Sequence, residues 1–238
     1  FITGRYKRAI EDHFDKSPEL EADLTAKGKY ELLDLVHSVT PRGVNFIFIR
    51  QPEPLGLGHA VLCARPVVGD EPFGVILADD LIYAQQPALG QLIGARSEMG
   101  GGSVLAVQNV EPKETNKYGI VGVDDELKQT SCVRTMVEKP APEAAPSTLA
   151  VIGRYVLEPE IFTALEHVDR GVGGEIQLTD AMCELARTES MIAVDFTGKR
   201  YDMGNKLGVM QAQVEVALKH PEIGESFRAY LKELAKTL

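Results

Sequence analysis

Short apolar runs alternate with segments of helical spacing along the first half of the chain. Residues 44–49 (VNFIFI) and 74–78 (GVILA) are nearly continuous apolar runs rich in β-forming residues, which is typical of strands covered on both faces. Residues 58–68 and 87–99 favour helices, and residues 103–110 (SVLAVQNV) favour another strand. Because strands and helices alternate, the sequence predicts a doubly wound, mainly parallel sheet.

The chain opens with Phe1-Ile2-Thr3-Gly4, which has the pattern of the end of a buried strand and leads into a helical segment. Ser17-Pro18 is a typical helix start, and Gly28 is a possible break in the helix that follows. These features predict a strand and then two or three helices before residue 44.

The second half of the chain has a different order of predicted elements, with β-rich segments first and helical segments after them. Residues 118–126, 132–140 and 148–157 are β-rich with turn residues between them, so we expect antiparallel additions to the sheet. The remainder predicts helices, at 175–187, 205–220 and after Pro221. We interpret residues 1–238 as a single α/β domain with a helical C-terminus.

Composition and net charge limit the classes of function and of partner that this chain could have. The chain has 238 residues, 44% hydrophobic and 25% charged, which is typical of a globular protein with a sizeable core. Its formal net charge of -10 argues against nucleic acid as a partner. An anionic substrate would therefore need local lysines, helix N-termini or a metal ion.

The cysteines and the hydropathy pattern add two expectations. Cys63, Cys132 and Cys183 are far apart and lack metal-ligand spacing, which favours a reducing cytoplasm and no structural zinc. No apolar run approaches the roughly 18 residues of a membrane span, so no membrane partner is expected.

Two acidic motifs lie where a strand gives way to a loop: LADD, which contains Asp79 and Asp80, and KRYDMG, which contains Asp202. Mg²⁺ is usually held by one or two carboxylates while phosphate oxygens and water complete its shell. Adjacent strand residues point to opposite faces, so we choose Asp79 and Asp202 as the metal pair. Turn formation or helix capping by Asp79 is the alternative.

The segment 51–60 (QPEPLGLGHA) follows a predicted strand and opens a helix, where open α/β sheets bind ligands. The amide of Gln51 can both donate and accept, which matches an imide edge such as that of uracil. Gly56 and Gly58 would let backbone approach a ring closely. A glycine-rich turn with a solvated Gln51 is the alternative, and His59 is interpreted as a packed or capping residue.

Further candidates lie at strand and helix ends. In MVEKP, Glu138 could accept hydrogen bonds from sugar hydroxyls and Lys139 could face a phosphate, provided the chain turns before Pro140; an exposed charge pair is the alternative. Lys206 begins a predicted helix just after Asp202, where an anion could meet both its ammonium group and the helix amides.

Two more residues are candidates for sugar contacts. Glu175 lies near a predicted helix start, where capping is an equally economical role. Gly119 could offer backbone groups to a hydroxyl or could relieve a tight strand crossing.

Eight segments together span nearly the whole chain: ITGRYKRAIEDHFD, FIRQPEPLGLGHAV, LADDLI, YGIVG, MVEKP, AVIGRYVL, GGEIQLTDA and YDMGNKLGVMQA. In this order they resemble segments of the bacterial UTP:glucose-1-phosphate uridylyltransferases, also called UDP-glucose pyrophosphorylases. The resemblance implies a Rossmann-like nucleotidyltransferase fold, Mg²⁺ dependence, a homo-oligomer, and the synthesis of UDP-glucose from UTP and glucose 1-phosphate.

The resemblance also implies roles for the candidates. Gln51, Gly56 and Gly58 look like the uracil site, and Asp79 with Asp202 looks like the magnesium pair. The implied glucose contacts are Gly119, Glu138 and Glu175, and the implied phosphate-facing lysines are Lys139 and Lys206. Tyr6 stands where the family often has a small or polar residue, which changes none of these roles.

The family's first strand, its GxGTR phosphate loop and a following lysine have no counterpart in these residues. The sequence therefore leaves three alternatives to uridylyl transfer onto glucose 1-phosphate: a related sugar-nucleotide synthetase using dTTP or another sugar phosphate, a UDP-sugar-binding fragment without catalysis, and a chain that folds only with a partner.

Overall fold

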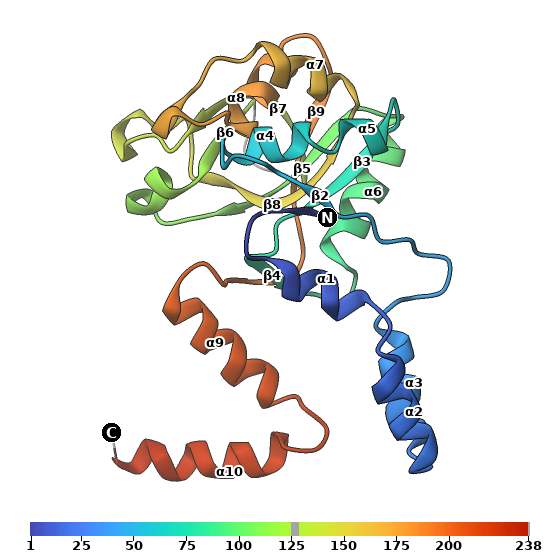
Figure 1. Ribbon diagram of the computed structural model, residues 1–238. Helices are drawn as coiled ribbons and strands as arrows, with labels where there is room; N and C mark the ends of the chain where they lie inside the picture. The colour runs from blue at the N-terminus through green and yellow to red at the C-terminus, as the bar shows by residue number, and fades with distance from the viewer. Residues whose placement is uncertain (125–128, 238) are drawn as a thin grey trace. The chain divides into compact units, whose positions relative to one another are not determined.

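A computed structural model describes residues 1–124 and 129–237 (Figure 1). The chain forms two compact units. Unit 1 comprises Phe1–Gly69 and Leu165–Leu178, and unit 2 comprises Asp70–Ala164 and Thr179–Leu238. Each unit has its own architecture, and the interpretation of residues 1–238 as one domain stays a prediction.

Unit 1 begins with two very short parallel strands, β1 (Ile2–Thr3) and β2 (Ile49–Arg50), in which Ile2 pairs with Ile49. The predicted strand at 44–49 is therefore wrong over most of its length, since residues 44–48 form no ladder. Its apolar side chains serve ring packing instead. Phe46 stacks on Phe14 at 4.4 Å between ring centroids, and Phe48 stacks on Phe1 at 5.3 Å.

Three helices connect these strands: α1 (Arg8–Phe14), α2 (Pro18–Ala26) and α3 (Tyr30–Ser38). Pro18 is the first residue of α2, as predicted, because a helix's first amide needs no partner and proline has none to offer. Gly28 separates α2 from α3 with a φ of 64°, so the predicted break is confirmed.

The helix predicted at 58–68 is two helices, α4 (Leu57–Leu62) and α5 (Arg65–Val68). Pro66 lies in the first turn of α5, and because it lacks an amide hydrogen it cannot continue the hydrogen bonding of α4. Residues 165–178 complete unit 1 and include the 3-10 turn Val172–Gly174.

Unit 2 contains a six-stranded mixed sheet in the order β3-β8-β5-β9-β7-β6, with β6 also pairing with β8. Its strands are β3 (Phe73–Ile76), β5 (Ser103–Asn109), β6 (Gly119–Val123), β7 (Thr130–Glu138), β8 (Leu149–Leu157) and β9 (Met191–Asp195). Residues 125–126 of the strand segment predicted at 118–126 lie outside the described residues.

The mixed α/β class is confirmed, but the predicted mainly parallel pairing is wrong for the described residues. Among the strand pairs of the described residues, only β1 with β2 and β5 with β9 are parallel. β8 runs antiparallel to β3, β5 and β6, and β7 runs antiparallel to β6 and β9. Strand direction depends on tertiary pairing, which the alternation of strands and helices leaves open.

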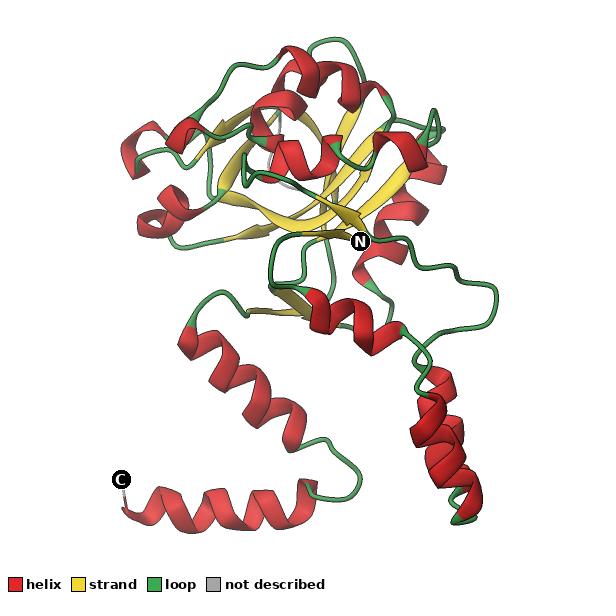
Figure 2. Ribbon diagram, viewed as in Figure 1, coloured by secondary structure: helices red, strands yellow, loops and turns green. Residues whose placement is uncertain are grey.

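The core of unit 2 lies on this sheet. Consecutive residues 104–107 of β5 are fully buried, and so is Ile152 of β8, as expected for central strands. Helix α6 (Ala88–Met99) packs against the sheet through Ala88 and Leu92. Figure 2 shows the strands in yellow and the helices in red.

A two-stranded antiparallel ladder joins β4 (Asp80–Tyr83) to β10 (Lys199–Asp202) and positions the candidate acids. The remaining helices are α7 (Glu160–His167), α8 (Leu178–Leu185), α9 (Lys206–Ala217) and α10 (Gly224–Leu234), with 3-10 turns Pro112–Lys117, Pro142–Ala144 and Ala235–Thr237. Across the described ranges, no helix has both the length and the apolar character needed to cross a bilayer.

Candidate functional site

The ladder of β4 and β10 brings Asp79 and Asp202 together. Asp202 pairs with Asp80, and the amide of Met203 donates to the carbonyl of Asp79 at 2.7 Å. A Cβ built on Gly204 would lie 3.0 Å from Oδ1 of Asp202 and 3.8 Å from Oδ2 of Asp79. Both carboxylates therefore lie within 4 Å of one point. The two strands are far apart in sequence: Asp80 of β4 and Arg200 of β10, which hydrogen-bond to each other, are 120 positions apart.

The neighbouring Asp80 is buried, and both of its carboxylate oxygens accept hydrogen bonds from the protein. It is 7% exposed, its Oδ2 accepts from the amide of Gly153 at 2.8 Å, and its Oδ1 accepts from Nε of Arg200. Arg200 in turn donates to the hydroxyl of Tyr118 at 3.3 Å and lies over its ring. Asp79 is exposed, so of the two adjacent acids it is the one with a carboxylate facing outward.

Arg154 fixes the loop before Asp80. Its Nη1 donates to the carbonyls of Leu77 at 3.1 Å and Gly153 at 2.7 Å, and its Nη2 donates to the carbonyl of Asp80 at 2.6 Å. Burial lowers the pKa of Arg154, while the charges of Asp80 and Asp79 oppose that shift. The sequence reasoning missed Arg154 and Arg200, since nothing local marks an arginine as the partner of a loop 77 or 120 residues away.

Strands β6 and β7 bring Gly119 opposite Glu138. A Cβ on Gly119 would lie 2.8 Å from Oγ1 of Thr179 and 3.2 Å from Oε2 of Glu138, so glycine is required here for close packing. Burial, and then the charge of Glu138, raise the pKa of Asp180. Glu138 thus lies among polar groups, with only 10% of its side chain exposed.

Lys139 makes the turn that the sequence interpretation required. Its φ is 47°, in the left-handed region that a non-glycine residue rarely adopts, and its amide donates to the carbonyl of Tyr118 at 2.9 Å. The turn brings Nζ of Lys139 to 3.3 Å from Oε1 of Glu138, so these adjacent side chains lie together rather than on opposite faces. Backbone strain of this kind is commonly retained at functional sites.

Lys206 is the first residue of α9, directly after the capping residue Asn205, whose Oδ1 accepts from the amide of Gly208 at 2.7 Å. A Cβ on Gly208 would collide with the carbonyl oxygen of Asp202 at 2.0 Å, so glycine allows this helix start to meet the end of β10. A further cation is nearby: the pKa of Lys117 is raised by Glu114 and, to a smaller extent, by Tyr118 and Asp202.

In unit 1, the turn after β2 packs on residues 175–176. The amide of Gly58 donates to the carbonyl of Ile176 at 2.9 Å, and the amide of Ile176 donates to the carbonyl of Leu55 at 2.8 Å. A Cβ on Gly56 would lie 2.8 Å from Cβ of Glu175, and one on Gly58 would lie 2.7 Å from the carbonyl oxygen of Ile176. Both glycines therefore have a packing reason, and their approach to a ring stays a prediction.

Two predicted residues of unit 1 have polar partners. Nε2 of Gln51 donates to the carbonyl of Gly56 at 3.1 Å and contacts Nδ1 of His59 at 3.0 Å, so Gln51 is not merely solvated. Glu175 is exposed, its Oε2 accepts from Nε2 of Gln177 at 3.3 Å, and α8 begins three residues later. Glu175 is thus not the residue that precedes the helix, and its sugar contact stays a prediction.

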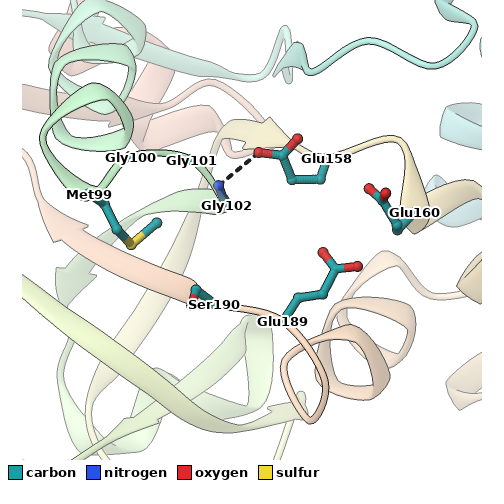
Figure 3. A pocket seen from close by; sticks show the side chains of 8 residues that line it. All are labelled: Met99, Gly100, Gly101, Gly102, Glu158, Glu160, Glu189 and Ser190. Atoms are coloured by element: carbon teal, nitrogen blue, oxygen red, sulfur yellow. Dashed lines mark hydrogen bonds between the residues drawn. The ribbon is translucent and has the colours of Figure 1, made fainter.

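A separate hollow of about 380 Å³ in unit 2 contains none of the predicted residues (Figure 3). It is lined by Met99, Gly100, Gly101, Gly102, Glu158, Glu160, Glu189 and Ser190. Glu158 is already paired with Arg96 at 2.6 Å. Within the described residues no group of three or more acidic, histidine or cysteine side chains could enclose a metal ion, so a metal at Asp79 and Asp202 would need other oxygen ligands.

Comparison with known proteins identifies a family and several relatives of similar sequence. Residues 6–219 match the family described as nucleotidyl transferase. A UTP–glucose-1-phosphate uridylyltransferase of Bacillus subtilis, YngB, is 48% identical over 99% of this chain and 78% of its own length. One of Staphylococcus epidermidis is 46% identical over 98% of this chain and 80% of its own.

Solved structures similar to this chain include proteins of the same kind as these relatives. The UTP-bound UGPase from Acinetobacter baumannii has a TM-score of 0.89 and 38% identity, covering 98% of this chain and 82% of that chain. A UDP-glucose pyrophosphorylase complexed with UDP-glucose has a TM-score of 0.77 and 36% identity, covering 98% and 80%.

Proposed function

Because this chain belongs to the nucleotidyl transferase family, and within it to the bacterial UTP–glucose-1-phosphate uridylyltransferases, we propose that it transfers the uridylyl group of UTP to glucose 1-phosphate. A phosphate oxygen of glucose 1-phosphate attacks the α-phosphorus of UTP, and the bond from that phosphorus to the β-phosphate oxygen breaks. The products are UDP-glucose and pyrophosphate, and no protein nucleophile is needed.

The observation that best supports this proposal is the convergence of Asp79 and Asp202 at the ends of two paired strands. Asp79 is exposed and Asp202 is partly exposed, and within the described residues neither forms a buried ion pair, in contrast to Asp80. Two carboxylates with room for other ligands are what Mg²⁺ uses when substrate phosphates complete its shell. Mg²⁺ held by Asp79 and Asp202 would neutralise phosphate charge as it develops during transfer.

The remaining residues would act by holding the substrates. Lys139 and Lys206 supply positive charge for phosphate oxygens, and Lys206 does so at a helix N-terminus, where the helix dipole also favours an anion. Glu138 would accept from sugar hydroxyls beside Gly119, with Glu175 as a further sugar contact. Gln51, in the turn with Gly56 and Gly58, would meet the imide edge of uracil. Positioning and charge neutralisation supply most of the catalysis in such transfers.

The test is Asp202→Asn, measured by synthesis of UDP-glucose and by UTP binding. We expect turnover to fall about 100-fold or more while the Kd for UTP changes much less, because a metal ligand acts mainly on the developing charge. Asp195→Asn is the matched control, since Asp195 is also an aspartate at the end of a strand, and it should keep full turnover. Unchanged turnover in Asp202→Asn would contradict the metal role.

The alternatives can be separated with the same protein. Competition among UTP, dTTP and several sugar phosphates would identify a synthetase of different specificity. Calorimetry that detects UDP-glucose binding by a chain without synthesis would favour a binding role instead.

We also propose self-association through α10. Ile223, Phe227, Tyr230 and Leu234 recur at helical spacing, and Ile223, Tyr230 and Leu234 are 46%, 58% and 40% exposed. An apolar stripe of this length is costly to leave in water. Tyr230→Lys should lower the mass measured by light scattering, whereas Lys232→Ala on the same helix should not; equal masses would remove α10 from the interface.

The three cysteines are free, and Cys132 is exposed, which supports a reducing compartment such as the cytoplasm.

A further inference from the structure

The amide of Gln51 has a defined orientation. Its Nε2 donates to the carbonyl oxygen of Gly56 at 3.1 Å. A carbonyl oxygen can only accept, so the NH₂ end of the amide must face Gly56, and the opposite assignment would set two oxygens against each other. Both side-chain hydrogen bonds of Gln51 within the described residues use Nε2, which leaves Oε1 as the atom available to a ligand.

This orientation determines the tautomer of His59. Nδ1 of His59 lies 3.0 Å from the same Nε2, so Nδ1 must accept and the ring proton must be on its other nitrogen. That nitrogen, Nε2, lies 3.9 Å from Sγ of Cys63, the residue at the C-cap of α4. Burial raises the pKa of the Cys63 thiol, so the sulfur is a neutral, weak acceptor.

The turn that carries these groups is itself fixed. Gly56 has a φ of 103°, and a Cβ there would collide with Ile176, so the carbonyl that receives Gln51 is held by packing. The amide of Ala60 donates back to the same Gly56 carbonyl at 3.1 Å, which ties it to the start of α4. His59 lies on that helix and is half-buried. The amide of Gln51 is therefore held by two groups of α4: the carbonyl of its N-cap residue Gly56 and the ring of His59.

We propose that His59 is a positioning residue that sets base selectivity by holding Gln51 with its Oε1 outward. This inference rests on the proposed function, in which Gln51 meets the base. An outward Oε1 accepts from the N3–H of an imide base such as uracil or thymine. Cytosine has an acceptor at that position, so it would place two acceptors face to face, and an unpaired polar group of this kind discriminates strongly between ligands.

The test compares two variants of one residue. His59→Phe keeps a ring but cannot accept, so Gln51 keeps only its hydrogen bond to the carbonyl of Gly56 and its amide is held less firmly. We expect the Kd for UTP to rise ~10-fold, and the preference for UTP over CTP to fall ~10-fold, with affinity for glucose 1-phosphate within about twofold of wild type. His59→Asn should restore much of the preference, because its Oδ1, like Nδ1 of histidine, is bonded to Cγ and can accept.

Calorimetric titration of the whole chain with UTP, CTP and glucose 1-phosphate gives these values. Equal losses for UTP and CTP in both His59 variants would mean that His59 only supports the fold, and would overturn the inference. An unchanged preference in His59→Phe would overturn it as well.

Gln51→Leu separates this inference from the proposed function. If Gln51→Leu weakens UTP binding but His59→Phe does not, the positioning role fails and the proposed function stands. If Gln51→Leu leaves UTP binding unchanged, or the wild-type chain binds no UTP, the base-binding part of the proposed function fails first.

Discussion

Two strand ends in unit 2 carry adjacent charged residues, and the fold treats them in opposite ways. At Asp79-Asp80 the side chains separate: Asp80 is buried with Arg200 and the amide of Gly153, whereas Asp79 is exposed. At Glu138-Lys139 the side chains meet, because Lys139 adopts a left-handed backbone that brings its ammonium group to 3.3 Å from the carboxylate.

The difference shows two ways of presenting a charge at a strand end. At Asp79-Asp80 the chain turns at residues 78–79 and enters β4 at Asp80, which gives Asp80 to the protein interior and leaves Asp79 exposed; the interior residue then needs a full set of partners. At Glu138-Lys139 the left-handed backbone of Lys139 gives both residues to the same side and requires backbone strain instead. The first arrangement should be sensitive to loss of a buried partner, and the second should be sensitive to changes in backbone freedom.

Asp80→Asn tests the interior residue and should have the largest effect. It removes one charge of a pair whose side chains are only 11% and 9% exposed and leaves Arg200 without compensation. Loss of one partner of a buried ion pair costs about 3–5 kcal/mol, which urea unfolding would measure. Asp79→Asn is the matched control and should change the free energy of unfolding by less than about 0.5 kcal/mol. Similar losses in both variants would contradict the contrast between the two acids.

Gly153→Ala tests the same acid from its other partner. A Cβ on Gly153 would lie 2.7 Å from Oδ2 of Asp80 and 2.6 Å from Cβ of Leu77, so either the loop or β8 must shift. We expect a loss of about 1–3 kcal/mol in the free energy of unfolding, as for other overpacked sites. Gly90→Ala, at a glycine with open space around it, should be neutral or stabilising; a Gly153→Ala protein as stable as wild type would show that the loop adapts freely.

Lys139→Gly tests the turn. Glycine removes the left-handed strain, a gain of about 1 kcal/mol that its greater freedom in the unfolded chain partly offsets. Stability should therefore stay within about 1 kcal/mol of wild type or rise slightly, while UDP-glucose synthesis falls because a phosphate-facing charge is lost. Lys139→Met, which loses the charge but keeps the strain, should lower synthesis equally without the gain in stability.

Tyr6→Gly is the control for the turn and should have the smallest effect on activity. Tyr6 is the other described non-glycine residue with a positive φ, at 71°, and it is 87% exposed. Its replacement should raise the free energy of unfolding by up to about 1 kcal/mol and leave synthesis unchanged. A loss of synthesis as large as that of Lys139→Gly would mean that left-handed backbone alone does not mark the functional turn.

Much of the candidate site could be proposed from the sequence because its signals are local. Asp79 follows an apolar run, and a strand end at Pro140 was predictable because proline has no amide hydrogen for a ladder. The left-handed backbone of Lys139 was not predictable in this way, since proline favours extended backbone in the residue before it. Alternation along a strand led to the choice of Asp79 over Asp80; Asp80 is buried, but Asp79 lies in the turn before β4 and not in a strand. Helix starts at Pro18 and after Asn205 are likewise properties of a few neighbouring residues.

Tertiary structure alone decided the rest. The antiparallel direction of β8, the contacts of Arg154 and Arg200 with a loop far away in sequence, and the packing of Gly56 and Gly58 on residues 175–176 all join segments that no local pattern connects. The amide orientation of Gln51 belongs to this group, since it depends on which atoms of Gly56 and His59 face it. Hydrophobic periodicity specifies which face of an element is buried, whereas hydrogen bonds between distant groups require coordinates, because donors and acceptors act only over about 3 Å.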